Sequence, residues 1–189
     1  MSDDPAQHRA AIDKGLAQVE RLLWLFNITR TFFAEDFTHG SELFALKECL
    51  DAVIADCSPL AESKNVRLQL DIRDNPSVFA NRQHLQHALE NILNVCFRST
   101  NPGETLTIKA ECSRQIRIQI PCGRMFSPDE RDSAFHPFPP GVEVKPGQAA
   151  NLDLALSRRI VQSFSGEVTI VQGPAQNCLF QVTLPIPLA

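Results

Sequence analysis

Three residues in the segment 80–100 have a spacing that could form a binding surface. Asn91, Val95 and Arg98 lie about one helical turn apart, so a ligand over them would meet an amide, a hydrocarbon side chain and a guanidinium. The opposite side is apolar, with side chains that repeat every three or four residues: Leu85, Leu89, Ile92 and Cys96. This pattern predicts an amphipathic helix with one side in the core and one exposed side whose polar groups could bind a ligand.

The run NILNVCFRSTNPG at 91–103 resembles the N box of histidine-kinase ATPase domains, a superfamily shared with gyrase and MutL. The resemblance implies a helix that holds Mg-ATP and is followed by a Pro-Gly turn, here Pro102 and Gly103. The family's metal-ligating Asn falls on Val95. A hydrocarbon cannot coordinate a hard cation that prefers oxygen, so the metal contact is expected to be lost.

Two further boxes of the resembled family also differ here. Where the family carries Asp-x-Gly-x-Gly for adenine, this chain has PCGRM at 121–125, and only Gly123 remains. Where glycines wrap the phosphates, this chain has AANLDL at 149–154, and Asp153 adds a negative charge. We therefore expect a remnant pocket without cofactor or metal, formed by Asn91, Val95, Arg98, Gly123, Asn151 and Asp153. The resulting prediction is a pseudo-ATPase that is not an enzyme.

Composition excludes several classes of function. The net charge of -4 and the scattered Lys and Arg residues give no footprint for nucleic acid. No apolar run reaches membrane-spanning length, and the acidic start MSDDPAQH is unlike a signal peptide, so a cytoplasmic protein is expected. The six cysteines form no Cys-x-x-Cys pair and are interpreted as small buried hydrophobes.

The segment 5–34 predicts one long helix with an apolar surface too wide for one flank of a small domain. It resembles the second helix of a histidine-kinase dimerisation hairpin. Homodimerisation or docking is therefore expected through these residues: Leu16, Val19, Leu23, Trp24, Phe26 and Phe33. The one candidate phosphoacceptor is His8, whose neighbours do not match the family's motif, so a surface histidine is the favoured interpretation.

The remaining elements predict an α+β fold. A helix is expected from Ser41 to about Lys64, with Leu43 facing inward, and the following strands alternate with helices at 80–100 and 151–164. Together with the resemblance, which runs from about Ser41 to Pro187, the order of elements predicts a two-layer α/β sandwich. In this fold, a mixed sheet carries helices on one face and a long N-terminal helix precedes it. The expected domains are 1–38, a dimerisation or docking helix, and 39–189, the ATPase-like domain.

Three functions fit these observations. The first is a non-catalytic, nucleotide-independent regulatory or protein-interaction module of bacterial two-component signalling, whose partner is a histidine kinase or a response regulator. The second is a histidine phosphotransferase with a decayed ATPase domain, which needs His8 as phosphoacceptor. The third is a divergent ATP-dependent protein kinase of the anti-sigma-factor type, which would require the altered boxes to bind nucleotide.

Overall fold

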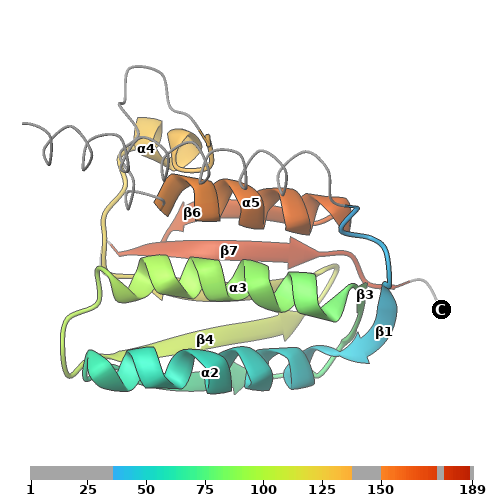
Figure 1. Ribbon diagram of the computed structural model, residues 1–189, viewed down its shortest axis with the longest axis horizontal. Helices are drawn as coiled ribbons and strands as arrows, with labels where there is room; N and C mark the ends of the chain where they lie inside the picture. The colour runs from blue at the N-terminus through green and yellow to red at the C-terminus, as the bar shows by residue number, and fades with distance from the viewer. Residues whose placement is uncertain (1–35, 138–149, 174–176, 188–189) are drawn as a thin grey trace, which may run out of the picture. The chain divides into compact units, whose positions relative to one another are not determined.

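The computed structural model describes residues 36–137, 150–173 and 177–187 (Figure 1). The expected dimerisation segment, including Leu16 to Phe33 and His8, lies outside these residues. The structure therefore does not test the predictions made for that segment.

Strands and helices are interspersed along the described chain. The strands are β1 (Glu42–Ala45), β2 (Arg67–Ile72), β3 (Ser77–Ala80), β4 (Thr105–Cys112), β5 (Ile116–Cys122), β6 (Glu167–Gln172) and β7 (Cys178–Leu184). The helices are α2 (Leu46–Ser63), α3 (Arg82–Phe97), α4 (Pro128–Ser133) and α5 (Ala150–Ser163). These elements follow one another in the order β1, α2, β2, β3, α3, β4, β5, α4, α5, β6 and β7.

Five of the strands form one mixed sheet in the order β2-β4-β5-β7-β6. The β2–β4 pair is parallel, and every other neighbouring pair in this sheet is antiparallel. β1 and β3 form a separate two-stranded antiparallel sheet. Alternate residues of β5 and β7 are buried, as expected for strands with one face against a core.

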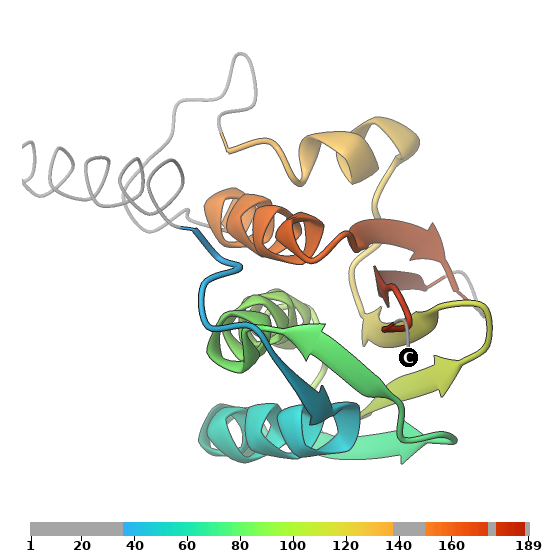
Figure 2. The ribbon, with the colours of Figure 1, turned by 90° about the vertical axis from the view of Figure 1, so that its right-hand side faces the viewer.

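Helices α2, α3 and α5 lie side by side over one face of the five-stranded sheet (Figures 1 and 2). α3 contacts both of the other helices, and it also contacts β5 beneath it. This arrangement confirms the predicted fold class, a mixed sheet with helices on one face. No helix in the described part of the chain is both long and apolar enough to cross a bilayer.

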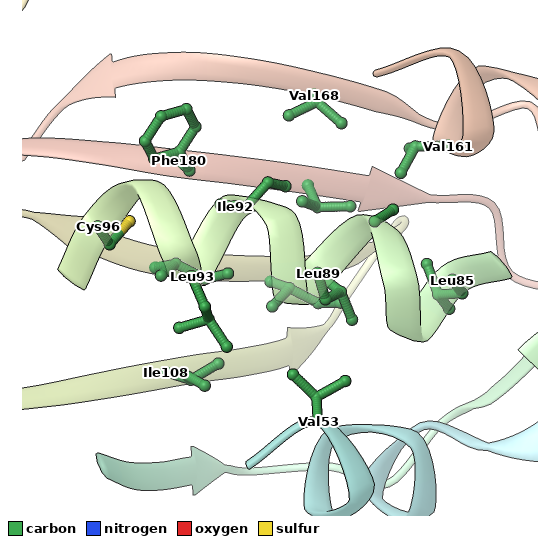
Figure 3. Packing of buried hydrophobic residues seen from close by; sticks show 14 of the residues in the cluster. Val53, Leu85, Leu89, Ile92, Leu93, Cys96, Ile108, Val161, Val168 and Phe180 are labelled. Atoms are coloured by element: carbon green, nitrogen blue, oxygen red, sulfur yellow. The ribbon is translucent and has the colours of Figure 1, made fainter. Parts of the chain in front are cut away.

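The apolar side of α3 is the centre of the core (Figure 3). The side chains predicted to face inward are fully buried: Leu85, Leu89, Ile92 and Cys96. They pack with residues of the neighbouring helices and of the sheet, among them Val53, Ile108, Val161 and Phe180. Burying one such side chain contributes about 1.5–3 kcal/mol to folding, so this helix is a large part of the hydrophobic driving force.

The start of α2 differs from the sequence prediction. The helix was expected from Ser41, but residues 42–45 form β1, and α2 begins at Leu46. The first amides of α2 are satisfied by distant residues: Leu46 N–H donates to the Pro76 carbonyl (2.9 Å), and Lys47 N–H donates to Asn75 Oδ1 (3.0 Å). Pairing with β3 therefore overrides the local helical pattern, and Leu43, expected to face inward, is 61% exposed.

Candidate functional site

A side-chain cap and a long-range hydrogen bond fix the start of α3. Asn81 Oδ1 accepts from the His84 backbone N–H (3.1 Å), and Asn81 Nδ2 donates to the His39 carbonyl (2.7 Å). An asparagine at this position satisfies an amide that has no partner within the helix. The helix begins at Arg82, two residues after the predicted start at Ala80, and the side of the helix predicted to be apolar is the buried side.

The three residues that defined the candidate surface differ in exposure. Arg98, which follows the last residue of α3, is exposed, and Asn91 is half-buried. Val95 is only 9% exposed and belongs to the core cluster. Its expected place on the exposed side is therefore wrong.

Asp153, in the first turn of α5, carries the clearest electrostatic signal of the site. Burial raises the pKa of its carboxyl above the usual 3.8, and the charges of Arg98 and His87 partly offset this effect. Both basic residues come from the α3 side, so the charge of Arg98 acts on Asp153 across two helices. Asn151 also begins α5, but its side chain lies outside the described residues.

A buried hydroxyl ties the two helices of the site together. Ser157 Oγ is close to two backbone carbonyls, those of Ala88 in α3 (3.0 Å) and of Asp153 in its own helix (2.7 Å). Ser157 is fully buried, so its polar atom needs such partners. This contact holds the first turns of α5 against the middle of α3.

Gly123 is placed by close packing. A Cβ atom at this position would lie 2.1 Å from the carbonyl oxygen of Ser99, which follows α3. The backbone after β5 therefore presses directly on the chain that leaves α3. The one glycine retained in this box is required for that contact, a role that the sequence did not reveal.

The residues gathered here do not match the ligand set of Mg-ATP in the resembled family. The position of the metal-ligating amide is Val95, a largely buried hydrocarbon, and the position of a phosphate-facing glycine is the desolvated carboxylate Asp153. Among the described residues, no group of three His, Cys, Asp or Glu side chains could hold a metal ion. The fold around the site is thus the same as in the resembled family, and the side chains at the metal and phosphate positions differ.

Sequence reasoning missed one group of residues near the site. The thiol of Cys122, the last residue of β5, lies 3.2 Å from Ser99 Oγ, and the buried thiol of Cys96 in α3 lowers its pKa. Each cysteine was interpreted separately as a small buried hydrophobe, and all six are free. No local pattern could have joined Cys96 to Cys122, because the contact depends on how α3 lies on β5.

The fold and the arrangement of these elements are those of a histidine-kinase-type ATPase domain. Residues 80–188 match the family described as histidine kinase-, DNA gyrase B-, and HSP90-like ATPase. Because this match spans more than half of the chain, the protein belongs to that family. The predicted superfamily is therefore confirmed.

Relatives and solved structures agree with this assignment. The adaptive-response sensory kinase SasA of Synechococcus elongatus is 27% identical over 175 residues, which are 90% of this chain and 45% of that protein. The full-length ShkA structure in complex with AMPPNP has a TM-score of 0.73 at 20% identity, covering all of this chain and 41% of that one. The complex of histidine kinase ThkA with response regulator TrrA has a TM-score of 0.70 at 15% identity, covering 98% and 53%. The chain spans less than half of the length of the curated relatives that it matches.

One prediction is wrong. The three altered boxes led to the expectation that the chain is not an enzyme but a pseudo-ATPase. The chain belongs to an ATPase family, and its matched relatives are named sensory kinases, which are enzymes. Substituted side chains at single positions change how a site binds, and they do not by themselves establish the absence of activity.

We expect Gly123→Ala to destabilise the protein. The added Cβ would meet the Ser99 carbonyl at 2.1 Å, and the backbone must shift to relieve the clash. Overpacking of this kind costs about 1–3 kcal/mol, measurable by urea unfolding. The control is Gly103→Asn, at a position with open space around it, where the φ of 88° strains any side chain but no atom clashes. Because asparagine accepts a positive φ better than most residues, this substitution should cost less than Gly123→Ala. Equal effects of the two substitutions would contradict the packing argument.

We expect Asp153→Asn to raise the melting temperature at neutral pH. Because the native-state pKa lies above the usual 3.8, the carboxyl's stabilising contribution is present below that value and is lost as pH rises through the native-state pKa. The gain of the variant over the wild type should therefore increase from about pH 4 to about pH 7, followed by thermal unfolding. Asp132→Asn, at an exposed position of α4, serves as the control. A gain that is independent of pH would contradict this explanation.

Proposed function

We propose that this chain is the ATPase-fold domain of a bacterial two-component signalling protein and acts by binding a protein partner, a histidine kinase or a response regulator. One observation carries the proposal. The chain belongs to the ATPase family and keeps its buried core, while the residues at the family's metal and phosphate positions differ. It is supported by relatives named sensory kinases, and by the likeness to a kinase solved together with a response regulator.

We further propose the division of labour expected from the sequence. Residues 1–38 serve as a dimerisation or docking helix, and residues 39–189 form the ATPase-like domain. The support is the wide apolar seam of that segment, Leu16 to Phe33, and the extent of the match with the Synechococcus relative, which covers 90% of this chain and so reaches beyond residues 80–188. The homodimer is part of this proposal.

Partner binding in this proposal does not require nucleotide. In the resembled family, the metal joins the phosphates to the N-box helix through an amide oxygen. Val95 provides no oxygen, and Asp153 puts a carboxylate near the phosphate position. A partner surface, by contrast, needs shape and apolar area, which the described domain retains: Leu43 and Phe79 are cross-strand neighbours on β1 and β3 and are 61% and 58% exposed.

The proposal is tested by measuring binding of the full chain to purified histidine kinases and response regulators encoded in the same genome, using biolayer interferometry. At least one should bind with a Kd of about 1 μM or tighter, with the same affinity in the presence and absence of ATP and Mg²⁺. Leu16→Asn combined with Leu23→Asn should weaken binding and reduce the mass measured by light scattering from two chains to one.

The matched control for this experiment is Gln18→Asn, a polar change between two seam positions of the same segment. It should bind like the wild type and remain dimeric. Failure of every candidate partner to bind, or binding that appears only with nucleotide, would contradict the proposed function. A monomeric wild type that still binds would contradict the assignment of residues 1–38 alone.

The role of position 95 gives a separate prediction. Val95→Asn restores an amide oxygen where the family's metal ligand is found, so calorimetry should show tighter ATP binding than in the wild type, and the gain should require Mg²⁺. Val95→Ile keeps a hydrocarbon and is the control. Identical behaviour of the two variants, with and without Mg²⁺, would show that position 95 does not face the metal.

A further inference from the structure

A hollow is present on the outer face of the five-stranded sheet, the face that points away from α2, α3 and α5 (Figure 2). On β4, Leu106, Ile108 and Ala110 are buried in the core, so the residues between them point to this outer face. Residues of β4, β5 and β7, with one residue just before β7, line a hollow of about 360 Å³: Thr105, Thr107, Lys109, Gln119, Pro121, Asn177 and Leu179. This volume lies within the range of small-molecule sites in proteins.

The floor of the hollow is apolar. Pro121 and Leu179 lie opposite each other in the β5–β7 register, and both are half-buried. Val171 of β6 is the register partner of Leu179 on its other side, so it extends the same apolar row beyond the hollow. A floor of this kind favours a ligand with a flat or branched hydrocarbon body over a lone inorganic ion, because the body removes apolar surface from water.

The rim of the hollow carries polar groups. Thr105 and Thr107 contribute hydroxyls, and Asn177 contributes an amide. The side chain of Gln119 is held in place, because its Nε2 donates to Gln181 Oε1 on the neighbouring strand (3.2 Å). These groups are spaced around the apolar floor, as they are in sites that fix the orientation of a ligand by a few hydrogen bonds.

The single charge among the lining residues is the ammonium group of Lys109. Its register partners are Asp71 on β2 and Gln119 on β5. Within the described part of the chain, no ion pair or hydrogen bond holds this ammonium, although Arg117 on the same face pairs with Glu111 at 2.8 Å. The hollow therefore offers an unpaired positive charge beside an apolar floor.

We propose that this hollow binds a small organic acid with an aromatic or branched apolar body. The body lies over Pro121 and Leu179, and the carboxylate accepts hydrogen bonds from the ammonium of Lys109 and the hydroxyl of Thr107. A carboxylate has only acceptors and an ammonium only donors, so the two are complementary. This site is on the opposite face of the sheet from the helices that form the candidate site, and the inference does not depend on the proposed partner or on nucleotide.

The test uses the full wild-type chain labelled with ¹⁵N and titrated with 1-naphthoate, while backbone amide shifts are followed by NMR. We expect shifts centred on the residues that line the hollow, with a Kd of about 1 mM or tighter. The neutral ligand 1-naphthamide has the same body without the charge and should bind about tenfold more weakly. Shifts centred on α3 and α5, equal affinity for the two ligands, or equally tight binding of inorganic phosphate would overturn the proposal.

Substitutions at exposed positions then assign the charge. Lys109→Gln should weaken naphthoate binding about tenfold, to the level of the amide, whereas Lys109→Arg should retain it. Asp71→Asn should tighten binding, because it removes a negative charge beside the ammonium.

The matched control is Lys47→Gln, which removes an exposed lysine of α2 that pairs with Asp51. It should bind naphthoate like the wild type. Equal loss of binding in Lys109→Gln and Lys47→Gln, or weaker binding in Asp71→Asn, would contradict the assignment of the carboxylate to Lys109.

Discussion

The structure depends on the burial of α3 from three directions. α2 and α5 flank this helix and the sheet lies beneath it, so an unbroken apolar side is required along its whole length. Leu85 at its start and Cys96 at its end are both fully buried. The remaining elements are placed with reference to this helix: the hydroxyl of Ser157 fixes α5 against it, and the contact between Gly123 and Ser99 fixes the end of β5.

This constraint explains why the scaffold persists while the contact residues differ. A change on the buried side of α3 opens a cavity and costs about 2–5 kcal/mol for a leucine truncated to alanine. A change on the exposed side of α3 costs far less, because those positions contribute little to the core. Val95 differs from them: this hydrocarbon at the family's metal-ligand position is 9% exposed and belongs to the core cluster. At position 95, hydrophobic packing therefore replaces the polar metal contact of the resembled family.

The sequence predicted what is periodic and local. The phase of α3, the alternation of the strands and the glycine and proline turns identified the α+β fold and its sheet face. Prediction from the sequence failed where contacts between distant residues determine the secondary structure. β1 replaces the expected helical start because residues 42–45 pair with β3. Asn75 and Pro76 then accept hydrogen bonds from the first amides of α2. At the candidate site, the resemblance placed Arg98 and Asp153 in one pocket, and the charge of Arg98 does act on Asp153. The 3.2 Å approach of Ser99 Oγ to the Cys122 sulfur required coordinates, since no spacing along the chain joins these residues.

The junction where α3 and β5 end shows how the core places residues that are distant in the sequence. Gly123 lets the backbone after β5 reach the carbonyl of Ser99, where a Cβ atom would lie only 2.1 Å from that oxygen. The Ser99 hydroxyl lies 3.2 Å from the sulfur of Cys122, which is 1% exposed, so this hydroxyl gives the buried thiol a polar neighbour. Close packing of a helix end on a strand end therefore brings together residues of two of the altered motifs, and a substitution in one of them must be compatible with the other.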